Sequence, residues 1–249
     1  MDLSAQYEHQ YRWRCWQQAY QALPPLAEAH LLDLGCSLGD QSRDLAALGA
    51  RVLGIDADEQ LITIARSRQI PGATFELGDI REPNVEGPVD GIWASFVAAY
   101  FPDLMSVLIR WRALLGPGGW IALTEVSSLF AHEPLSAGAR SLLDTYAREA
   151  FEAGRYDFDM GCKLASHLAL AGFHVEASRV LPDQELSFTG AADTDVLNAW
   201  AERLYRMRLL QERARQSYPS LQDDFLQCLS SPAHATECRV HFCIARSGT

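Results

Sequence analysis

The chain has 249 residues, of which 48% are apolar, 10% aromatic and 21% charged, so it can form a sizeable hydrophobic core. This composition argues against a disordered chain or a coiled coil. The formal net charge of −11 disfavours generic binding to nucleic acid or to an anionic membrane surface, because phosphate groups would be repelled.

The start of the chain and the cysteines bear on where the protein works. Residues 1–6 are polar and acidic, and no segment approaches the ~18 consecutive apolar residues of a membrane span. We therefore expect a cytoplasmic protein with no secretory signal and no membrane association. The six cysteines lie far apart and form no C-x-x-C pair, which is typical of reduced thiols and provides no zinc-binding spacing.

Aromatic residues recur at helical spacing over residues 2–22, and Pro24-Pro25 ends that predicted helix. Beyond it, short β-prone segments alternate with segments whose apolar residues recur every three or four positions. The predicted strands are 30–34, 51–55, 73–77, 89–94, 120–125, 173–181 and 239–246. The predicted helices among them are 40–48, 58–68, 103–115, 137–153 and 160–171. Asp40, Asp58 and Asp103 stand where N-caps are expected.

This alternation predicts an α/β fold, a doubly wound sheet of mostly parallel strands with helices on both faces. The last of seven strands follows a long, polar, helix-rich segment. We expect one domain over residues 1–249. Its expected parts are an N-terminal helical cap at 1–25, a core sheet from 30–185 and 236–247, and a helical insertion or lid at about 190–235.

The turn after the first predicted strand is the most informative segment, Gly35-Cys36-Ser37-Leu38-Gly39. Small residues there let the backbone approach a ligand at the sheet edge where such folds bind them. The dinucleotide fingerprint fits poorly, because its third glycine would fall at Asp40, whose charge would repel a pyrophosphate. The pattern G-x-S-x-G also occurs at hydrolase nucleophile elbows, but that elbow has no need of an acid such as Asp33 before it.

Three aspartates end three successive predicted strands. Asp33 could attract an ammonium or sulfonium charge, and Asp56, 21 residues beyond Gly35, could accept both hydroxyls of a ribose. Asp79 could accept from an exocyclic amine while Ile80 packs on a purine. Each aspartate alone could be a simple turn or cap residue, but together they favour a positively charged nucleoside that carries no phosphate.

These segments resemble the class I S-adenosylmethionine-dependent methyltransferases. The matching segments are the glycine-rich loop 32–39, the ribose-binding 54–56, the adenine-binding 78–80, the fourth strand 89–95 and the turn 115–120 before the fifth. The resemblance covers about residues 30–126, and the last predicted strand is similar to the family's antiparallel seventh. One departure from the family's pattern is Ser37, which replaces the middle glycine of the loop.

The resemblance implies a seven-stranded Rossmann-like sheet and S-adenosylmethionine as cofactor, with S-adenosylhomocysteine as product. The cofactor would lie over the ends of the first, second and fourth strands, with Ser95 and Phe96 beneath its methionine portion. On the first helix, Tyr11 or Arg14 could meet its carboxylate, or the helix could simply pack on the core. The cofactor residues expected are therefore Asp33, Gly35, Cys36, Ser37, Gly39, Asp56, Ala57, Asp79, Ile80, Ser95, Phe96, Tyr11 and Arg14.

The acceptor is expected near the loops after the fourth and fifth strands. The first of these loops, 95–102, is apolar and lacks the N/D-P-P-Y tetrad of members that methylate adenine or glutamine. His132, in the second loop, is the candidate general base; alternatively it is an exposed loop residue. Tyr100 could orient a substrate or pack in the core. Five arginines of the helical insertion could bind an anionic substrate, form a solvated face or contact a second subunit: Arg203, Arg206, Arg208, Arg213 and Arg215.

These observations predict methyl transfer to an oxygen or nitrogen of a small-molecule metabolite by a monomer or homodimer, with no nucleic-acid partner and no metal. The alternatives are other chemistry with the same cofactor, a cofactor sensor without turnover, and a nicotinamide-dependent oxidoreductase.

Overall fold

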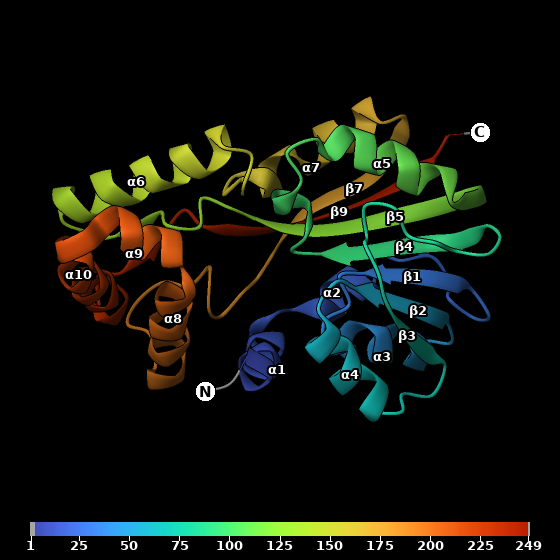
Figure 1. Cartoon of the computed structure of the whole chain (residues 1–249), viewed down its shortest axis with the longest axis horizontal. Coiled ribbons are helices and arrows are strands. Elements are labelled where there is room, and N and C mark those ends of the chain that lie inside the picture. The colour runs from blue at the N-terminus through green and yellow to red at the C-terminus, as the bar shows by residue number, and fades with distance from the viewer. Residues whose placement is uncertain (1–2, 249) are drawn as a thin grey trace.

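A seven-stranded sheet forms the centre of the computed structural model, which describes residues 3–248 (Figure 1). Its strands are β1 (His30–Leu34), β2 (Arg51–Asp56), β3 (Ala73–Leu77), β4 (Val89–Ser95), β5 (Leu115–Ser127), β7 (Phe173–Leu181) and β9 (Arg239–Ser247). Their order is β3-β2-β1-β4-β5-β9-β7. The first five pair in parallel, whereas β9 runs antiparallel to both β5 and β7. The predicted doubly wound, mostly parallel fold with an antiparallel last strand is therefore confirmed.

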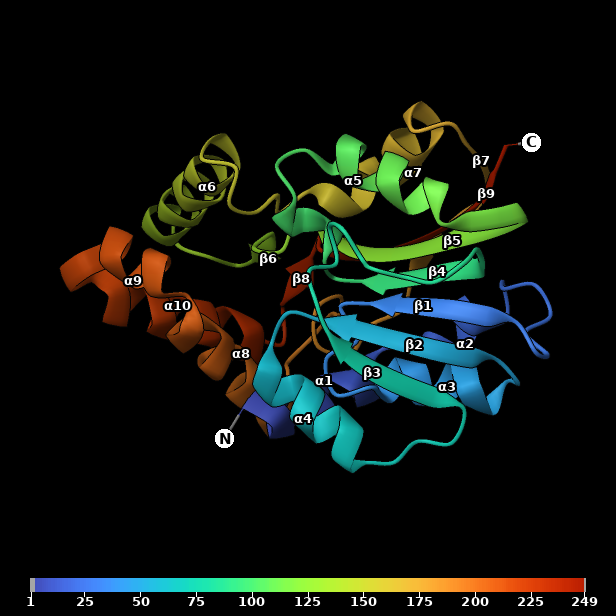
Figure 2. The same cartoon turned by 45° about the vertical axis from the view of Figure 1, so that its right-hand side comes forward.

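Helices cover both faces of this sheet and extend beyond it. The α-helices of the described residues are α1 (Leu3–Trp13), α2 (Trp16–Tyr20), α3 (Asp40–Ala47), α4 (Glu59–Ser67), α5 (Leu104–Ala113), α6 (Ala137–Glu152), α7 (Met160–Leu170), α8 (Thr194–Arg206), α9 (Arg208–Ala214) and α10 (Tyr218–Ser230). Helices α5 and α7 lie on one face, and α3 and α4 lie on the other, as Figures 1 and 2 show. Among the described residues, no helix combines the length and apolar character needed to cross a membrane.

Two of the three predicted N-caps are confirmed. Asp58 caps α4 by accepting the backbone N–H groups of Gln60 and Leu61, and Asp103 caps α5. At α3 the cap is Gly39, in the left-handed conformation with φ of +80°, and Asp40 is the first helical residue. This shift leaves the carboxylate of Asp40 to pair with arginines instead of capping the helix.

The single helix predicted over residues 2–22 is interrupted after Trp13 (residue 2 lies outside the described residues). The backbone of Arg14 forms an isolated antiparallel bridge with Asp183, and Trp13 accepts the N–H of Gln184 at 3.1 Å. This pairing takes backbone groups away from the helix, so α1 and α2 are separate elements. The break results from a contact distant in sequence, which local periodicity does not reveal.

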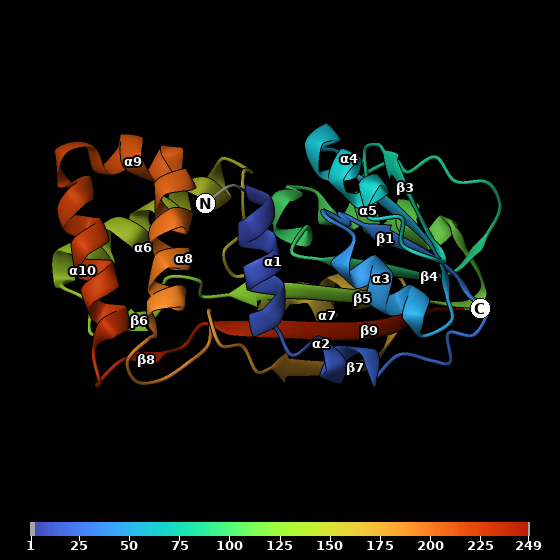
Figure 3. The same ribbon diagram turned by 90° about the horizontal axis from the view of Figure 1, so that it is seen from below.

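Beyond the carboxyl ends of the parallel strands lies a helical lobe, formed by α6, α8, α9 and α10 with the two-stranded sheet of β6 (His132–Glu133) and β8 (Ala235–Thr236) (Figures 1 and 3). The sequence predicted a helical insertion only at about 190–235, but α6 and β6 join it from the segment after β5. The lobe and the sheet share one hydrophobic cluster, to which Trp200 and Phe225 of the lobe and Trp93 and Phe242 of the sheet belong.

Candidate functional site

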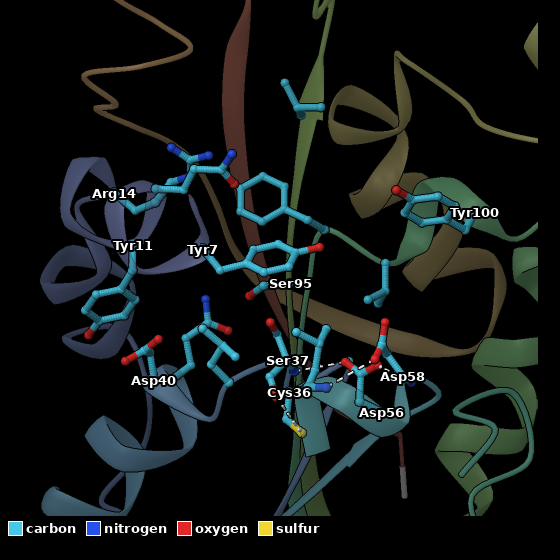
Figure 4. A pocket seen from close by; sticks show the side chains of 18 of the residues that line it. Tyr7, Tyr11, Arg14, Cys36, Ser37, Asp40, Asp56, Asp58, Ser95 and Tyr100 are labelled. Carbon is cyan, nitrogen blue, oxygen red and sulfur yellow. Dashed lines mark hydrogen bonds between the residues drawn. The ribbon is translucent and has the colours of Figure 1, made fainter. Parts of the chain in front are cut away.

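A cavity of about 570 Å³ lies where the chain reverses its winding, at the carboxyl ends of β1, β2 and β4 (Figure 4). The turns after these strands form one wall, and α1 and α8 form the opposite wall. Ligands of doubly wound sheets bind at this switch point, because the connections on either side of it diverge and leave a crevice. The cavity is therefore the candidate site.

The turn after β1 is ordered by hydrogen bonds within the protein. Gly35 and Cys36 donate their N–H groups to the carbonyl of Ile55, at 2.8 and 3.2 Å. Gly35 has a φ of +81°, and a Cβ there would lie 2.3 Å from a methyl carbon of Val97, so no larger residue fits. Ser37 also adopts the left-handed conformation, with φ of +50°, which costs a serine about 1 kcal/mol.

Asp56 lies at the end of β2 and lines the cavity, as the sequence predicted. One carboxylate oxygen accepts the N–H of Ser37 at 2.9 Å, and the other accepts the N–H of Asp58 at 3.0 Å (Figure 4). These two bonds fix the carboxylate and tie the turns after β1 and β2 to each other. Asp58, which the sequence analysis did not assign to the site, also lines the cavity.

Ser95 and Phe96 follow β4 and lie against the same cavity. The hydroxyl groups of Ser37 and Ser95 are buried and have no hydrogen-bond partner among the described residues. The ring of Phe96 contacts Trp16, at a centroid separation of 6.1 Å, and the guanidinium of Arg14 lies 5.3 Å from its centre. Two unpaired hydroxyls beside an acceptor carboxylate are a set of groups that suits a polar ligand.

Arg14 lines the cavity, but its charge is already paired. Its guanidinium lies 2.9 Å from both Asp183 and Glu185, and Glu185 also binds Arg203 at 2.5 Å. Burial raises the pKa of Asp183. Burial alone would raise the pKa of Glu185 too, but Arg203 and Arg14 hold it below its ordinary value. This buried network joins the end of α1 to α8, so the prediction that Arg14 meets the cofactor's carboxylate finds no support.

Three tyrosines from different segments of the chain also line the cavity: Tyr7 of α1, Tyr100 and Tyr156. The rings of Tyr100 and Tyr156 contact edge to face, with centroids 4.7 Å apart. Tyr100 is 60% exposed, so the alternative that it packs in the core is wrong. Burial raises the pKa of Tyr156 well above its ordinary value, and partial desolvation along the cavity raises the pKa values of Tyr7 and Tyr100. Tyr11 also lines the cavity and donates its hydroxyl to Asp44.

Several predicted cofactor residues do not line the cavity. Asp33 is fully buried behind the turn, where it accepts the hydroxyl of Ser42 at 2.5 Å, and burial raises its pKa to about 7. Gly39 acts as the cap of α3. Asp79 binds Arg81 on the exposed surface, and these hydrogen bonds hold its pKa below the ordinary value. Two further predicted residues outside the lining are Ala57 and Ile80.

His132 is not an exposed loop residue, and its predicted position as a general base is wrong. Its side chain is fully buried in the helical lobe, where Nδ1 shares a hydrogen bond of 2.9 Å with Nε2 of His234. The rings of Trp200 and Phe225 lie 5.2 and 5.4 Å from its own. Burial lowers its pKa to about 3. The imidazole therefore has neither access to the cavity nor the basicity to take a proton at neutral pH.

Other lining residues reach the site through tertiary packing, and the sequence analysis did not assign Gln41 or Met207 to it. Gln41 of α3 lines the cavity, and its side-chain oxygen accepts the indole N–H of Trp93 at 2.9 Å. Arg203, Arg206 and Met207 come from the end of α8. In the sequence, these arginines lie on a predicted helix with an apolar stripe. That pattern is equally compatible with substrate binding, a solvated face and a subunit contact.

Comparison with known proteins identifies the family of this chain. The family described as "Methyltransferase domain" matches residues 31–119. Nocamycin O-methyltransferase from Saccharothrix syringae is 33% identical over 198 residues, which cover 71% of this chain and 69% of that protein. Trans-aconitate 2-methyltransferase from Methylobacterium nodulans is 36% identical over 109 residues, or 43% of this chain. That alignment spans only 42% of the relative's own length.

The fold has solved counterparts as well. A putative methyltransferase from Bacillus halodurans superimposes with a TM-score of 0.62 over 94% of this chain and 97% of that one, at 17% identity. Together, the matched family and the nocamycin relative establish the class: the chain belongs to the class I S-adenosylmethionine-dependent methyltransferases. S-adenosylmethionine is the cofactor of this family.

Proposed function

We propose that this protein transfers the methyl group of S-adenosylmethionine to an oxygen or nitrogen of a small-molecule acceptor. The observation that carries the proposal is one cavity with two parts. The part at the strand ends contains Ser37, Asp56 and Ser95, and the part toward the helical lobe is lined by aromatic and apolar side chains together with three arginines. A cofactor in the first part would present its methyl group to a ligand in the second.

The polar groups of the first part fit the cofactor. A carboxylate has about four acceptor sites, and the two backbone N–H groups at Asp56 leave capacity for both ribose hydroxyls. Because the oxygen of Gln41 is occupied by Trp93, its amide nitrogen remains to donate to the cofactor's carboxylate. We assign this role to Gln41 in place of Arg14. Ser37 and Ser95 supply hydroxyl groups that lack partners.

When bound, S-adenosylmethionine supplies an electrophilic methyl group on a cationic sulfur. The protein's own part is to position the two reactants and to exclude water. Phe96 and Trp16 form an apolar surface beside the unpaired hydroxyl of Ser95, and Tyr7 and Tyr100 border the space for the acceptor. The names of the relatives are consistent with a small acceptor: one is an O-methyltransferase, and the other acts on trans-aconitate.

Asp56→Ala tests the cofactor site, with Asp79→Ala as the matched control. Asp79 also ends a strand at this sheet edge but binds Arg81 outside the cavity. Because Asp56 would lose charge-assisted hydrogen bonds to the ribose, we expect S-adenosylhomocysteine to bind at least about tenfold more weakly by calorimetry. Binding to the Asp79→Ala protein should match the wild type.

Unchanged affinity in Asp56→Ala would contradict the site assignment. A second measurement supplies methyl-labelled S-adenosylmethionine together with the small-molecule fraction of bacterial cell extracts. Transfer of label to a small product supports the proposal. Normal cofactor binding without any transferred label would instead point to a sensor or to different chemistry with the same cofactor.

A further inference from the structure

The two walls of the cavity carry opposite charges. All three carboxylates that line it lie on the side of the sheet: Asp40 at the start of α3, and Asp56 and Asp58 after β2. All three guanidinium groups that line it come from the facing side, Arg14 at the end of α1, and Arg203 and Arg206 on α8. The described lining residues carry no further charged side chain on either wall. A cationic ligand is favoured at the first wall and an anionic ligand at the second.

Two of these three cations are already neutralised. Arg14 and Arg203 share the buried carboxylates of Asp183 and Glu185, so two positive charges meet two negative ones. Arg206, one turn after Arg203, is exposed and forms no ion pair among the described residues. Partial desolvation at the cavity wall and the charge of Arg203 lower the pKa of Arg206, and Tyr7, Glu202 and Glu185 partly oppose this. An anion beside Arg206 would relieve that repulsion.

The described lining residues include no side chain suited to remove a proton from an acceptor. The three aspartates are engaged: Asp40 pairs with Arg43 and Arg68, Asp56 accepts two backbone N–H groups, and Asp58 caps α4. Burial raises the pKa values of the thiol and phenols along the cavity, so these groups stay protonated. An acceptor that is already an anion at neutral pH needs no base.

Building on the proposed function, we propose that the acceptor is a carboxylic acid with an apolar body, that Arg206 binds its carboxylate, and that the product is a methyl ester. A carboxylate oxygen forms a bond to the methyl carbon as the carbon–sulfur bond breaks, and the electron pair of that bond remains on sulfur. The anion and the sulfonium cation give a neutral ester and a neutral thioether. No proton is released and no base is required.

The remaining lining supports an apolar body for this acid. Leu129 and Val126 follow or end β5, Leu186 precedes α8, and Met207 follows it, so apolar side chains from several elements meet there. Tyr7 of α1 lines the same cavity and adds an aromatic ring to this lining. A guanidinium can donate to one carboxylate oxygen or to both at once. Either arrangement leaves a lone pair on oxygen that can be directed at the methyl group.

The chemical stability of the product tests the acceptor class directly. The labelled product from the extract experiment is treated with mild alkali, which hydrolyses methyl esters to labelled methanol but leaves methyl ethers and methylamines intact. We expect the label of the principal product to become volatile. A base-stable label would overturn the ester assignment while leaving the proposed methyl transfer intact, whereas no labelled product at all would contradict the proposed function itself.

The role of Arg206 is tested on the acid identified in this way and on the amide of that acid. Arg206→Gln should weaken binding of the acid to protein saturated with S-adenosylhomocysteine at least about tenfold, because a charge-assisted pair is lost. The affinity of Arg206→Lys for the acid should lie between those of the wild type and Arg206→Gln, because lysine keeps the charge but lacks the planar guanidinium. Affinity for S-adenosylhomocysteine alone should stay unchanged.

The matched control is Arg208→Gln, two residues along, whose guanidinium lies over Tyr205 at 5.0 Å and does not line the cavity. Its KM for the acid should equal that of the wild type. Equal acid binding in the wild type and Arg206→Gln would overturn the role of Arg206, and so would binding of the acid and its amide with the same affinity.

Discussion

At the scale of single residues, the aspartates that end the strands differ in what their carboxylates contact. Asp56 reaches the cavity because the pairing of β1 with β2 brings its backbone beside the turn that contains Ser37. Asp79 ends the next strand, yet its carboxylate binds Arg81, two residues later. Asp33 remains behind the turn with Ser42. All three aspartates follow strands at one edge of the sheet, but of the three only Asp56 lines the cavity, because the direction of a side chain depends on its local partners.

The buried carboxyl group of Asp33 predicts a measurable pH dependence of stability. Burial raises its pKa in the folded protein to about 7, above the ordinary value of 3.8, so the unfolded chain releases the proton first as pH rises. Its contribution to the free energy of unfolding should therefore fall between about pH 4 and pH 7 and be constant above that. The upper bound of the loss is roughly 4 kcal/mol.

We expect Asp33→Asn to flatten this dependence, because asparagine resembles the protonated acid and has no proton to lose. Urea unfolding of both proteins from pH 4.5 to pH 8 would check it, with the exposed Glu86→Gln as control. Glu125, whose pKa burial also raises to about 7, should keep part of the slope in both proteins. If the free energy of unfolding changed with pH equally in the wild type and in Asp33→Asn, the expectation would be wrong.

At the scale of elements, the strands and most helices followed from periodicity, because their apolar spacing is a local property of the chain. The predicted strand 30–34 coincides with β1, and the predicted strand 173–181 coincides with β7. The break between α1 and α2 was not predictable, because it depends on Asp183, far along the chain. The burial of His132 was missed for the same reason: β6 pairs with β8, a hundred residues later.

The network that joins α1 to α8 should be costly to break. Glu185→Gln removes one negative charge from between Arg14 and Arg203, whose charges would then be incompletely balanced in a buried setting. We expect a loss of about 3–5 kcal/mol in the free energy of unfolding, measured by denaturant titration. The control is Glu149→Gln, which breaks the exposed pair with Arg213 and should cost at most about 1 kcal/mol. Similar losses in the two variants would show that the network is not structurally important.

At the scale of the whole molecule, the helical lobe and the sheet are packed around one hydrophobic cluster. Trp200 is fully buried in it and donates its indole N–H to the carbonyl of Glu185 at 2.9 Å. The sequence predicted a helical insertion but gave no indication that α6 belongs to it, because helix periodicity does not state which neighbour a helix packs against. The cavity wall that α8 provides therefore depends on contacts across the whole chain.

Trp200→Ala should destabilise the sheet as well as the lobe. Loss of a buried indole costs about 3–5 kcal/mol, and we expect one cooperative transition in which far-ultraviolet circular dichroism and tryptophan fluorescence coincide. The control is Tyr205→Ala on the same helix, where the side chain is 56% exposed, and its midpoint should stay near that of the wild type. Two separate transitions in Trp200→Ala would mean that the lobe and the sheet unfold independently.

The turn after β1 has a thermodynamic consequence for ligand binding. Its course is determined by the carbonyl of Ile55, the carboxylate of Asp56 and the side chain of Val97, all of which belong to the protein. The conformational entropy of this segment is therefore lost when the chain folds, not when the nucleoside arrives. Preorganisation of this kind leaves more of the contact energy available as affinity.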